Sequence, residues 1–143
     1  MQRPDIKKVR ALYAQIESSV KSGKYLHQSR SFEYCQPSIT ERTIYTDSNG
    51  TPRLYILSGG SDDHAEDSKY YYDSVGTIRF IFVSVGAVNG ANEEKRIYFD
   101  ERGKQIYTDK RVIHEPDLYL ERVETVLKPM DNFKSDSPCP EKK

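Results

Sequence analysis

Residues 96–107 read RIYFDERGKQIY, and the same pattern occurs twice earlier in the chain. The earlier copies are IYTDSNGTPRLYI at 44–56 and YYYDSVGTIRFIF at 70–82, and each places D-x-x-G between two runs of aromatic and β-branched residues. An aspartate that opens a type I turn accepts hydrogen bonds from backbone N–H groups two residues on, and glycine in the fourth place supplies a positive φ. Each copy therefore predicts a β-hairpin.

The three turns, at Asp47/Gly50, Asp73/Gly76 and Asp100/Gly103, form a weak internal repeat, because their aspartates lie 26 and 27 residues apart. Residues 29–36 are a candidate edge strand, which Pro37 would end. Hairpins joined in succession form an antiparallel meander. The expected strands are about 41–46, 52–58, 69–73, 77–85, 94–99 and 104–112.

A helix is predicted ahead of the sheet, at about residues 5–22. Ile6, Val9, Ile16 and Val20 fall on one stripe of a 3.6-residue period. A helix with a single apolar stripe buries only that face, so we expect it to lie across the sheet.

A second, shorter helix is predicted for about residues 116–127, and Lys128-Pro129 would end it. The residues beyond it are polar and contain prolines, which is typical of a mobile segment. The sequence thus predicts an α+β fold: an N-terminal helix packed on an antiparallel β-meander of about six strands, with a short C-terminal helix. Residues 1–130 would form this single domain, and residues 131–143 a mobile C-terminal tail.

The bulk composition argues against several partners. The chain has 143 residues, with 22 Lys plus Arg against 22 Asp plus Glu. This balance gives no general attraction to nucleic acid, so no nucleic-acid partner is expected. No apolar run approaches the roughly 18 residues of a membrane helix, so no membrane span is expected. The first residues contain no signal-peptide core. The protein would therefore be cytoplasmic, or a leader would have been removed.

The strands suggest two different faces. We expect one face of Ile, Leu and Phe, including Phe80, to lie under the helix, and the other face to be wet and rich in Tyr and Arg. Tyr and Arg are enriched where interfaces carry energy, but they also suit the plain solvent face of a sheet, so both interpretations stay open. The candidate binding residues on this face are Tyr45, Arg53, Tyr55, Arg79, Arg96, Tyr98 and Tyr107.

One acidic segment is a candidate metal site. Residues 59–68 are predicted as a long loop, and residues 86–93 as another. Calcium favours several oxygen ligands on one flexible loop, but this segment lacks the alternating ligand spacing of known calcium loops. A solvated hairpin loop explains it more simply. The candidate ligands are Asp62, Asp63, Glu66 and Asp67, with His64 among them.

Cysteine and motif content predict little chemistry. Cys35 and Cys139 are the two cysteines, and they could form a disulfide in an oxidising compartment or stay as two thiols. The sequence contains no H-E-x-x-H, C-x-x-C, G-x-S-x-G or phosphate-binding loop. We therefore predict no catalytic residue and no cofactor, and expect that the protein is not an enzyme.

The order of parts resembles a group of small bacterial exported proteins of unknown function. The resemblance rests on the leading DIKKVRALYAQI helix that ends in S-G-K, and on the tyrosine-rich meander with YYYDSVG and RIYFDERGK turns. It would cover about residues 5–112, and it implies a removed leader and a periplasmic or secreted location. That group has no known catalytic residues, so the resemblance assigns none to this chain. The balanced charge and the Cys139-bearing tail depart from its pattern.

The hairpin copies are also similar, by their turns alone, to MORN-variant proteins, which include some antitoxins. Three classes of function follow. The favoured class is a non-catalytic binding or interaction module for an unknown protein or small ligand. The second is an inhibitor or antitoxin-like neutralising partner, and a toxin or hydrolase encoded next to it would favour this class. The third is an enzyme with an unrecognised site, which a pocket joining His64 or His114 to carboxylates would favour.

Overall fold

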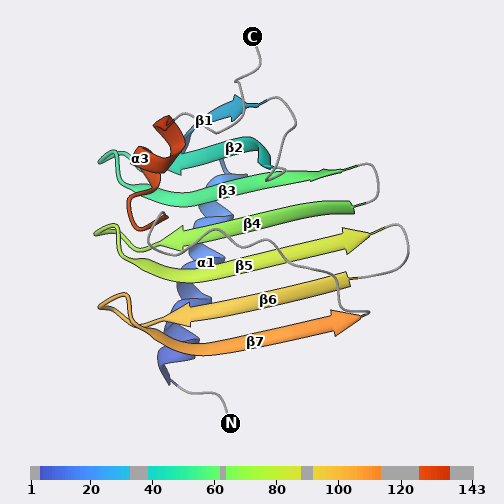
Figure 1. Ribbon diagram of the computed structural model, residues 1–143. Helices are drawn as coiled ribbons and strands as arrows, with labels where there is room; N and C mark the ends of the chain where they lie inside the picture. The colour runs from blue at the N-terminus through green and yellow to red at the C-terminus, as the bar shows by residue number, and fades with distance from the viewer. Residues whose placement is uncertain (1–3, 33–38, 62–63, 88–91, 114–125, 136–143) are drawn as a thin grey trace.

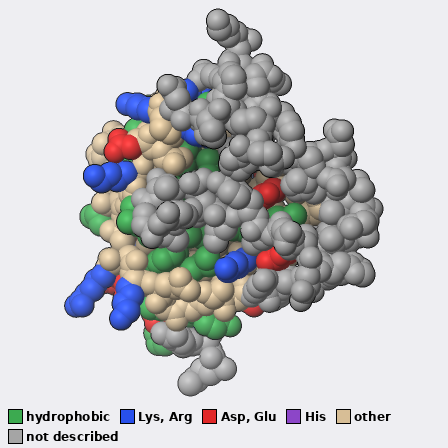
Figure 2. Space-filling view, viewed as in Figure 1, with side chains coloured by type: hydrophobic (Ala, Val, Ile, Leu, Met, Phe, Trp, Pro, Cys, Tyr) green, Lys and Arg blue, Asp and Glu red, His purple; other side chains and the backbone are tan. Residues whose placement is uncertain are grey.

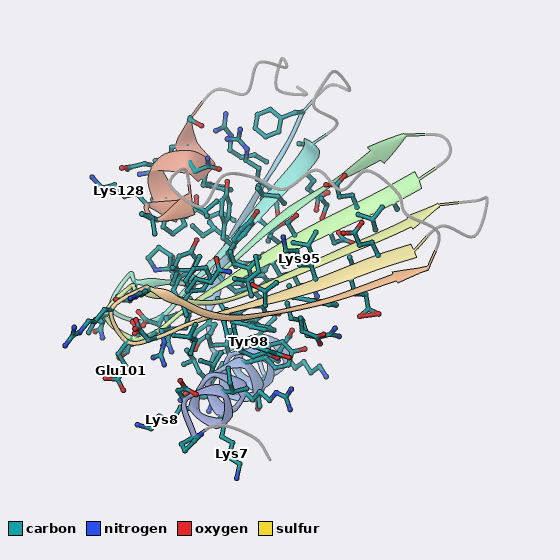
Figure 3. All side chains as sticks on the ribbon, turned by 60° about the horizontal axis from the view of Figure 1, so that its bottom comes forward. Lys7, Lys8, Lys95, Tyr98, Glu101 and Lys128 are labelled. Carbon is teal, nitrogen blue, oxygen red and sulfur yellow. The ribbon has the colours of Figure 1, made fainter. Side chains whose placement is uncertain are left out.

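A computed structural model of the chain describes residues 4–32, 39–61, 64–87, 92–113 and 126–135. A seven-stranded antiparallel sheet forms the centre of the fold, with helix α1 on one face and helix α3 on the other (Figure 1, Figure 3). The predicted α+β class is confirmed. The elements are α1 (Pro4–Lys21), β1 (Leu26–Ser31), β2 (Ile39–Thr46), β3 (Pro52–Ser61), β4 (His64–Tyr72), β5 (Ile78–Ala87), β6 (Asn92–Phe99), β7 (Gln105–Ile113) and α3 (Pro129–Lys134).

The strands follow one another in space as they do in sequence, from β1 to β7, so the predicted meander is confirmed. The candidate edge strand is β1, which adds one strand to the six expected ones and begins at Leu26, earlier than predicted. Residues 59–68 are not the predicted long loop, because Gly59 pairs with Glu66 and Ser61 with His64 as β3 and β4 continue. In the same way, Gly86 pairs with Asn92 at the ends of β5 and β6. Backbone pairing lengthens both hairpins although their side chains are small or polar.

The three D-x-x-G turns share one geometry, as predicted. In the first, Oδ1 of Asp47 accepts hydrogen bonds from the backbone N–H groups of Asn49 and Thr51, at 2.9 and 3.0 Å. The carboxylates of Asp73 and Asp100 accept the corresponding two bonds in their own turns. The three glycines have φ values of 79, 88 and 81°, where a Cβ would be strained. Turn chemistry therefore explains why the motif recurs.

A β-bulge follows each turn, three residues after the glycine. Tyr71 pairs with Phe80 and Tyr72 with Ile78, so Arg79 has no partner in the register. The same shift skips Arg53 in β3 and Ile106 in β7. A bulge changes which face the neighbouring residues occupy. The alternation of residue types along the sequence therefore does not indicate which face of the sheet a residue occupies once a bulge has been passed.

The two bulge arginines join neighbouring turns. Nε of Arg53 donates to the carbonyl oxygen of Tyr72 at 3.0 Å, and Nε of Arg79 donates to that of Phe99 at 3.1 Å. Each accepting residue stands just before the aspartate of the next turn. Both guanidinium groups also lie near the aspartate of their own turn, at 3.4 and 3.7 Å. In β7 the equivalent residue is Ile106, and the sheet has no further turn there to join.

The face under α1 has an apolar core. Val9 and Ile16 are fully buried between the helix and the sheet, as the helical stripe predicted. One row of cross-strand neighbours runs beneath them across β3 to β7. Its members are Leu54, Tyr71, Phe80, Tyr98 and Tyr107.

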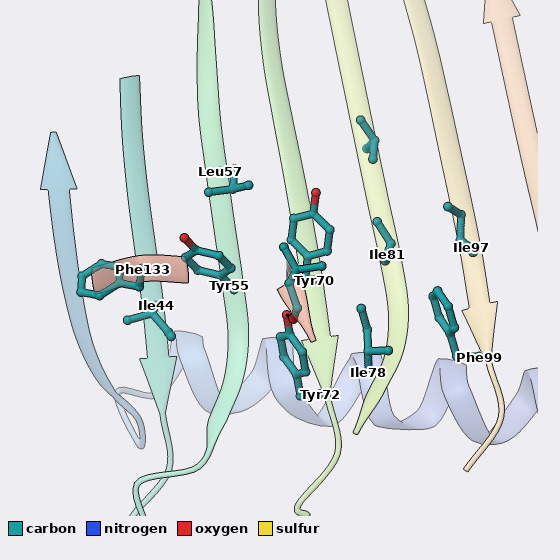
Figure 4. Packing of buried hydrophobic residues seen from close by; sticks show 12 residues of the cluster. Ile44, Tyr55, Leu57, Tyr70, Tyr72, Ile78, Ile81, Ile97, Phe99 and Phe133 are labelled. Carbon is teal, nitrogen blue, oxygen red and sulfur yellow. Dashed lines mark hydrogen bonds between the residues drawn. The ribbon is translucent and has the colours of Figure 1, made fainter. Parts of the chain in front are cut away.

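The opposite face is also buried, which Figure 4 shows from close by. A second row, from Ile44 through Tyr55, Tyr70 and Ile81 to Ile97, packs there with Phe133 of α3. In the space-filling view of this side, hydrophobic side chains show in the middle of the sheet, and Lys and Arg gather toward the end with the three turns (Figure 2).

These two cores overturn the expected wet face of Tyr and Arg. Phe80 pairs with Tyr98, and Ile81 with Ile97, so Tyr98 lies on the α1 face (Figure 3) and Ile97 on the other (Figure 4). Tyr98 is only 1% exposed and Tyr55 0%. The expectation that Tyr98 and Tyr55 lie on a wet face is therefore wrong. The physical reason is that register and bulges assign the faces, whereas the sequence interpretation sorted them by residue type.

The C-terminal helix is anchored by arginines from the first two strands. Nη1 of Arg42 donates to the carbonyl oxygens of Asn132 at 2.6 Å and Ser135 at 2.8 Å. Nη1 of Arg30 donates to that of Phe133 at 2.6 Å. Cationic side chains are well suited to the carbonyl groups that a helix leaves free at its C-terminal end.

The predicted boundary of the tail is therefore wrong for residues 131–135, which belong to α3 and the turn after it. Pro129 begins this helix, because proline fits the first turn, where its missing N–H costs nothing. The rest of the predicted tail, and the predicted helix up to residue 125, lie outside the described residues.

Candidate functional site

The seven candidate binding residues do not form one surface. Arg53 and Arg79 are buried and join the turns, and Tyr55 is buried on the α3 face, where its hydroxyl donates to Oδ1 of Asn132 at 2.6 Å. The other four belong to the α1 face, where Tyr107 is 46% exposed. These four are Tyr45, Arg96, Tyr98 and Tyr107.

The candidate metal ligands are not brought together among the described residues. Glu66 is buried, whereas Asp67 is the next residue of the same strand, is exposed, and accepts a hydrogen bond from Ser58 at 2.7 Å. Successive residues of a strand point to opposite faces. Within the described ranges, no group of three His, Cys, Asp or Glu side chains could hold a metal ion. Asp62 and Asp63 lie outside the described residues.

The disulfide prediction also lies outside them, since neither Cys35 nor Cys139 belongs to the described ranges. The same holds for His114, and of His64 only the backbone in β4 is described. The pocket that would join either histidine to carboxylates therefore stays a prediction.

A pocket lies beside α1, over β5 and β6. Its volume is about 280 Å³. Val9, Phe80 and Tyr98 are buried residues of its wall, and the other lining side chains are half-buried or exposed. The pocket thus has an apolar floor and a more polar rim. Its described lining consists of Val9, Arg10, Tyr13, Phe80, Phe82, Arg96 and Tyr98.

Aromatic packing shapes the floor. The rings of Phe80 and Tyr98 have their centroids 4.9 Å apart, and Tyr13 meets Phe80 edge-on at 5.5 Å. Tyr13 also meets Tyr71 edge-on at 5.1 Å. Tilted and edge-to-face contacts at these distances are favourable arrangements of aromatic rings. The floor is therefore built by mutually supported rings rather than by flexible chains.

Arg96 is one of the two arginines in the described lining of the pocket. Its guanidinium carbon lies 4.6 Å from the centroid of the Phe82 ring, and its Nη2 donates to Oε2 of Glu94 at 2.9 Å. Nη1 is buried and has no hydrogen-bond partner among the residues that the structure describes. A buried donor of this kind has lost water without gaining an acceptor, which is costly.

Tyrosine hydroxyls beside the pocket stay protonated at neutral pH. Burial raises the pKa of Tyr13, the Glu17 carboxylate raises it further, and the positive charge of Arg96 acts in the opposite direction. Burial likewise raises the pKa of Tyr71, whose hydroxyl donates to Oε1 of Glu17 at 2.7 Å. Tyr13 is therefore a poor general base and a good hydrogen-bonding group.

The sequence interpretation identified two of the pocket residues, Arg96 and Tyr98, but placed them on a wet face. It assigned Val9 and Phe80 to the core, which is where they lie. Arg10 and Phe82 were not singled out as site residues. The pocket depends on how α1 crosses β5 and β6, and no local pattern in the sequence specifies that placement.

Among the described helices, none is both long enough and apolar enough to cross a membrane. Comparison of the chain with protein-family models, with curated proteins and with solved structures finds no significant match. The resemblance to exported bacterial proteins, the location that it implies and the neutralising-partner alternative therefore stay predictions. The site itself is the basis for a functional proposal.

Proposed function

We propose that the protein is a non-catalytic binding module whose small ligand occupies the pocket between α1 and the β5–β6 pair. The observation that carries this proposal is the pocket of about 280 Å³ with an aromatic floor and Arg96 in its wall. Ligand sites are typically concave, mostly apolar and equipped with a few polar groups that fix orientation. The combination of floor and rim matches that description.

The size of the pocket suits a small molecule. A cavity of roughly 150 Å³ holds benzene, so about 280 Å³ accommodates one ring with a short substituent. It is below the roughly 300–1,000 Å³ typical of drug-sized ligands. A monocyclic compound is therefore the class that we expect.

The lining favours binding over catalysis. Of the described residues in the wall, none is a carboxylate, a histidine, a cysteine or a serine. Guanidinium and phenol groups bind and orient a ligand, and the raised pKa of Tyr13 makes it unsuited to removing protons near neutral pH. These features support a binding role.

A set of water-soluble monocyclic aromatic compounds tests the proposal by backbone NMR of the whole chain. Bound compounds should shift the amide signals of Val9, Phe82 and Arg96. Phe82→Trp enlarges a half-buried wall residue and should abolish these shifts by filling the space. Tyr45→Trp is the matched control, because Tyr45 is a half-buried aromatic residue of the same face that does not line the pocket.

Two results would contradict the proposal. One is that none of the compounds shifts the pocket signals of the wild-type protein. The other is that Phe82→Trp binds the compounds as well as the control Tyr45→Trp and the wild type do. Far-UV circular dichroism of both variants checks that each has kept the fold.

A further inference from the structure

We infer that the pocket selects an uncharged molecule that joins an aromatic ring to a carbonyl oxygen, and that Arg96 Nη1 donates a hydrogen bond to that oxygen. This inference rests on the proposed function and names the class of its ligand. It follows from the hydrogen-bonding groups of the wall, from the charges around Arg96 and from the shape of the floor.

The first step is the hydrogen-bonding character of the wall. Arg10 and Arg96 are donors only, and the Tyr13 hydroxyl is directed to Glu17. Nη1 of Arg96 is buried without an acceptor within the described part of the chain. The pocket wall therefore contains a donor that needs an acceptor, and a ligand with an acceptor oxygen would satisfy it.

The donor is close enough to the pocket to be used. Arg96 is a lining residue whose side chain is 27% exposed, although Nη1 itself is buried. Donation to a ligand requires a change in the terminal torsions of Arg96 that turns Nη1 toward the occupant. The bond from Nη2 to Glu94 and the contact with Phe82 place the guanidinium group beside the pocket before this change.

The second step is charge, which decides between a carboxylate and a neutral carbonyl. Glu94 forms an ion pair with Arg96, and Asp109 on β7 is the cross-strand neighbour of Arg96. Lys69 stands across Phe82 in the same row. Arg10 and Arg96 line the pocket itself, and the other four charged residues, which include Glu17, belong to α1 or to the sheet face beneath it. The formal charges of these three cations and three carboxylates cancel.

An anion would be attracted by Arg10 and Arg96 but repelled by the carboxylates beside them, and it would lose hydration on entering the pocket. Its charge would also stand near Glu94, which already occupies Nη2 of Arg96. For a buried ion pair the desolvation penalty can exceed the Coulombic gain, and only very good geometry offsets it. A neutral carbonyl oxygen satisfies Nη1 without that penalty, so the charges favour the uncharged ligand.

The third step is the body of the ligand. Phe80, Tyr98 and Tyr13 present ring faces and edges already packed at 4.9 and 5.5 Å. A further ring extends this packing, and aromatic pairs contribute beyond the area that they bury. The carbonyl group would then stand at the rim, on the side of Arg96.

Three probes of similar size separate the parts of the inference: acetophenone, benzoate and ethylbenzene. The first has a neutral carbonyl, the second a carboxylate and the third no acceptor. Their affinities are measured by NMR titration of the whole protein at neutral pH, through the amide signals of Val9 and Phe82. Because a hydrogen bond from a charged donor is typically worth a tenfold or larger change in affinity, acetophenone should bind about tenfold more tightly than either of the others.

Variants of Arg96 test the residue itself. Arg96→Met removes the donors and keeps a chain that can cover Phe82, so it should lower the affinity for acetophenone about tenfold and leave that for ethylbenzene unchanged. Arg96→Lys keeps the charge and the pairing with Glu94 but lacks the second guanidinium nitrogen, so it should show the same selective loss. It also provides the test if Arg96→Met does not fold.

The outcomes separate this inference from the proposed function. If benzoate binds most tightly, or if all three probes bind equally, the pocket is a binding site but the inference about its ligand is overturned. The same follows if the Arg96 variants weaken ethylbenzene as much as acetophenone. If none of the probes shifts the pocket signals, both the inference and the proposed function are wrong.

Discussion

Replacing Tyr98 with alanine should destabilise the whole fold, because this tyrosine lies in a core. Its side chain is 1% exposed and its ring contacts those of Phe80 and Tyr107, at centroid distances of 4.9 and 5.7 Å. A buried aromatic side chain covers roughly 150–250 Å², which at about 25 cal/mol per Å² corresponds to about 4–6 kcal/mol. The denatured chain already hides part of this area. We therefore expect a loss of about 3–5 kcal/mol in the free energy of unfolding, a large part of the ~5–15 kcal/mol that a domain possesses.

The assay is urea denaturation followed by far-UV circular dichroism, with Phe80→Ala and Tyr107→Ala for comparison. Phe80→Ala should cost about as much as Tyr98→Ala. Tyr107 is the cross-strand neighbour of Tyr98 but is 46% exposed, so its replacement should cost roughly 1–2 kcal/mol. The slope of the unfolding free energy against urea concentration should stay unchanged. If Tyr98→Ala is as mild as Tyr107→Ala, the buried placement of Tyr98 is refuted, and a wet sheet face regains its support.

Three further predictions concern the turns. Arg79→Met removes the donor to the buried residue Phe99 and should cost about 1–3 kcal/mol in urea denaturation; an unchanged midpoint would show that the arginine does not join the two turns. Gly76→Ala should cost about 1–2 kcal/mol, because its φ is 88° although a Cβ there has room, whereas Gly86→Ala, in open space within β5, should cost nothing; equal effects would contradict the turn geometry. Carboxyl NMR should place the pKa of Asp100 below its ordinary value, because the backbone N–H of Lys104 donates to its carboxylate. The stabilisation of the fold by this hydrogen bond is then present above the ordinary pKa and is lost as the pH falls through the lowered one. An ordinary titration midpoint would count against this prediction.

The turns and the first helix could be predicted from the sequence because their causes are local. Asp47 and Gly50 act within five residues of each other, and that short range is enough to specify a hairpin. Ile6, Val9 and Ile16 recur at helical steps, so the buried face of α1 is readable without knowing what covers it. A succession of such hairpins leads directly to the meander.

The faces of the sheet could not be read in the same way. Ile78 and Phe80 are two residues apart, yet they belong to opposite cores, because the bulge at Arg79 lies between them. The identity of Arg79 does not indicate a bulge, because an arginine at this position is also typical of an exposed residue in a regularly alternating strand. Its burial becomes clear only with its acceptor, the Phe99 carbonyl, which is 20 residues away.

The pocket and the C-terminal anchor were unpredictable for a related reason. Both depend on contacts between distant parts of the chain: Arg42 with the carbonyl of Asn132, 90 residues later, and Tyr13 with Phe80. A lysine-proline pair before residue 131 is compatible with the end of one helix or the start of another. In the structure Pro129 begins α3, and the arginines of β1 and β2 donate to carbonyl groups at its C-terminal end.

The most direct test of the account is where a bound ring lies. Intermolecular nuclear Overhauser effects should be measured between the ring protons of acetophenone and the labelled protein. The account predicts contacts with the methyl groups of Val9 and with the rings of Phe82 and Tyr98. Contacts confined to the opposite core, at Met130 and Phe133 of α3, or no contacts under saturating acetophenone, would contradict a ligand site between α1 and the sheet.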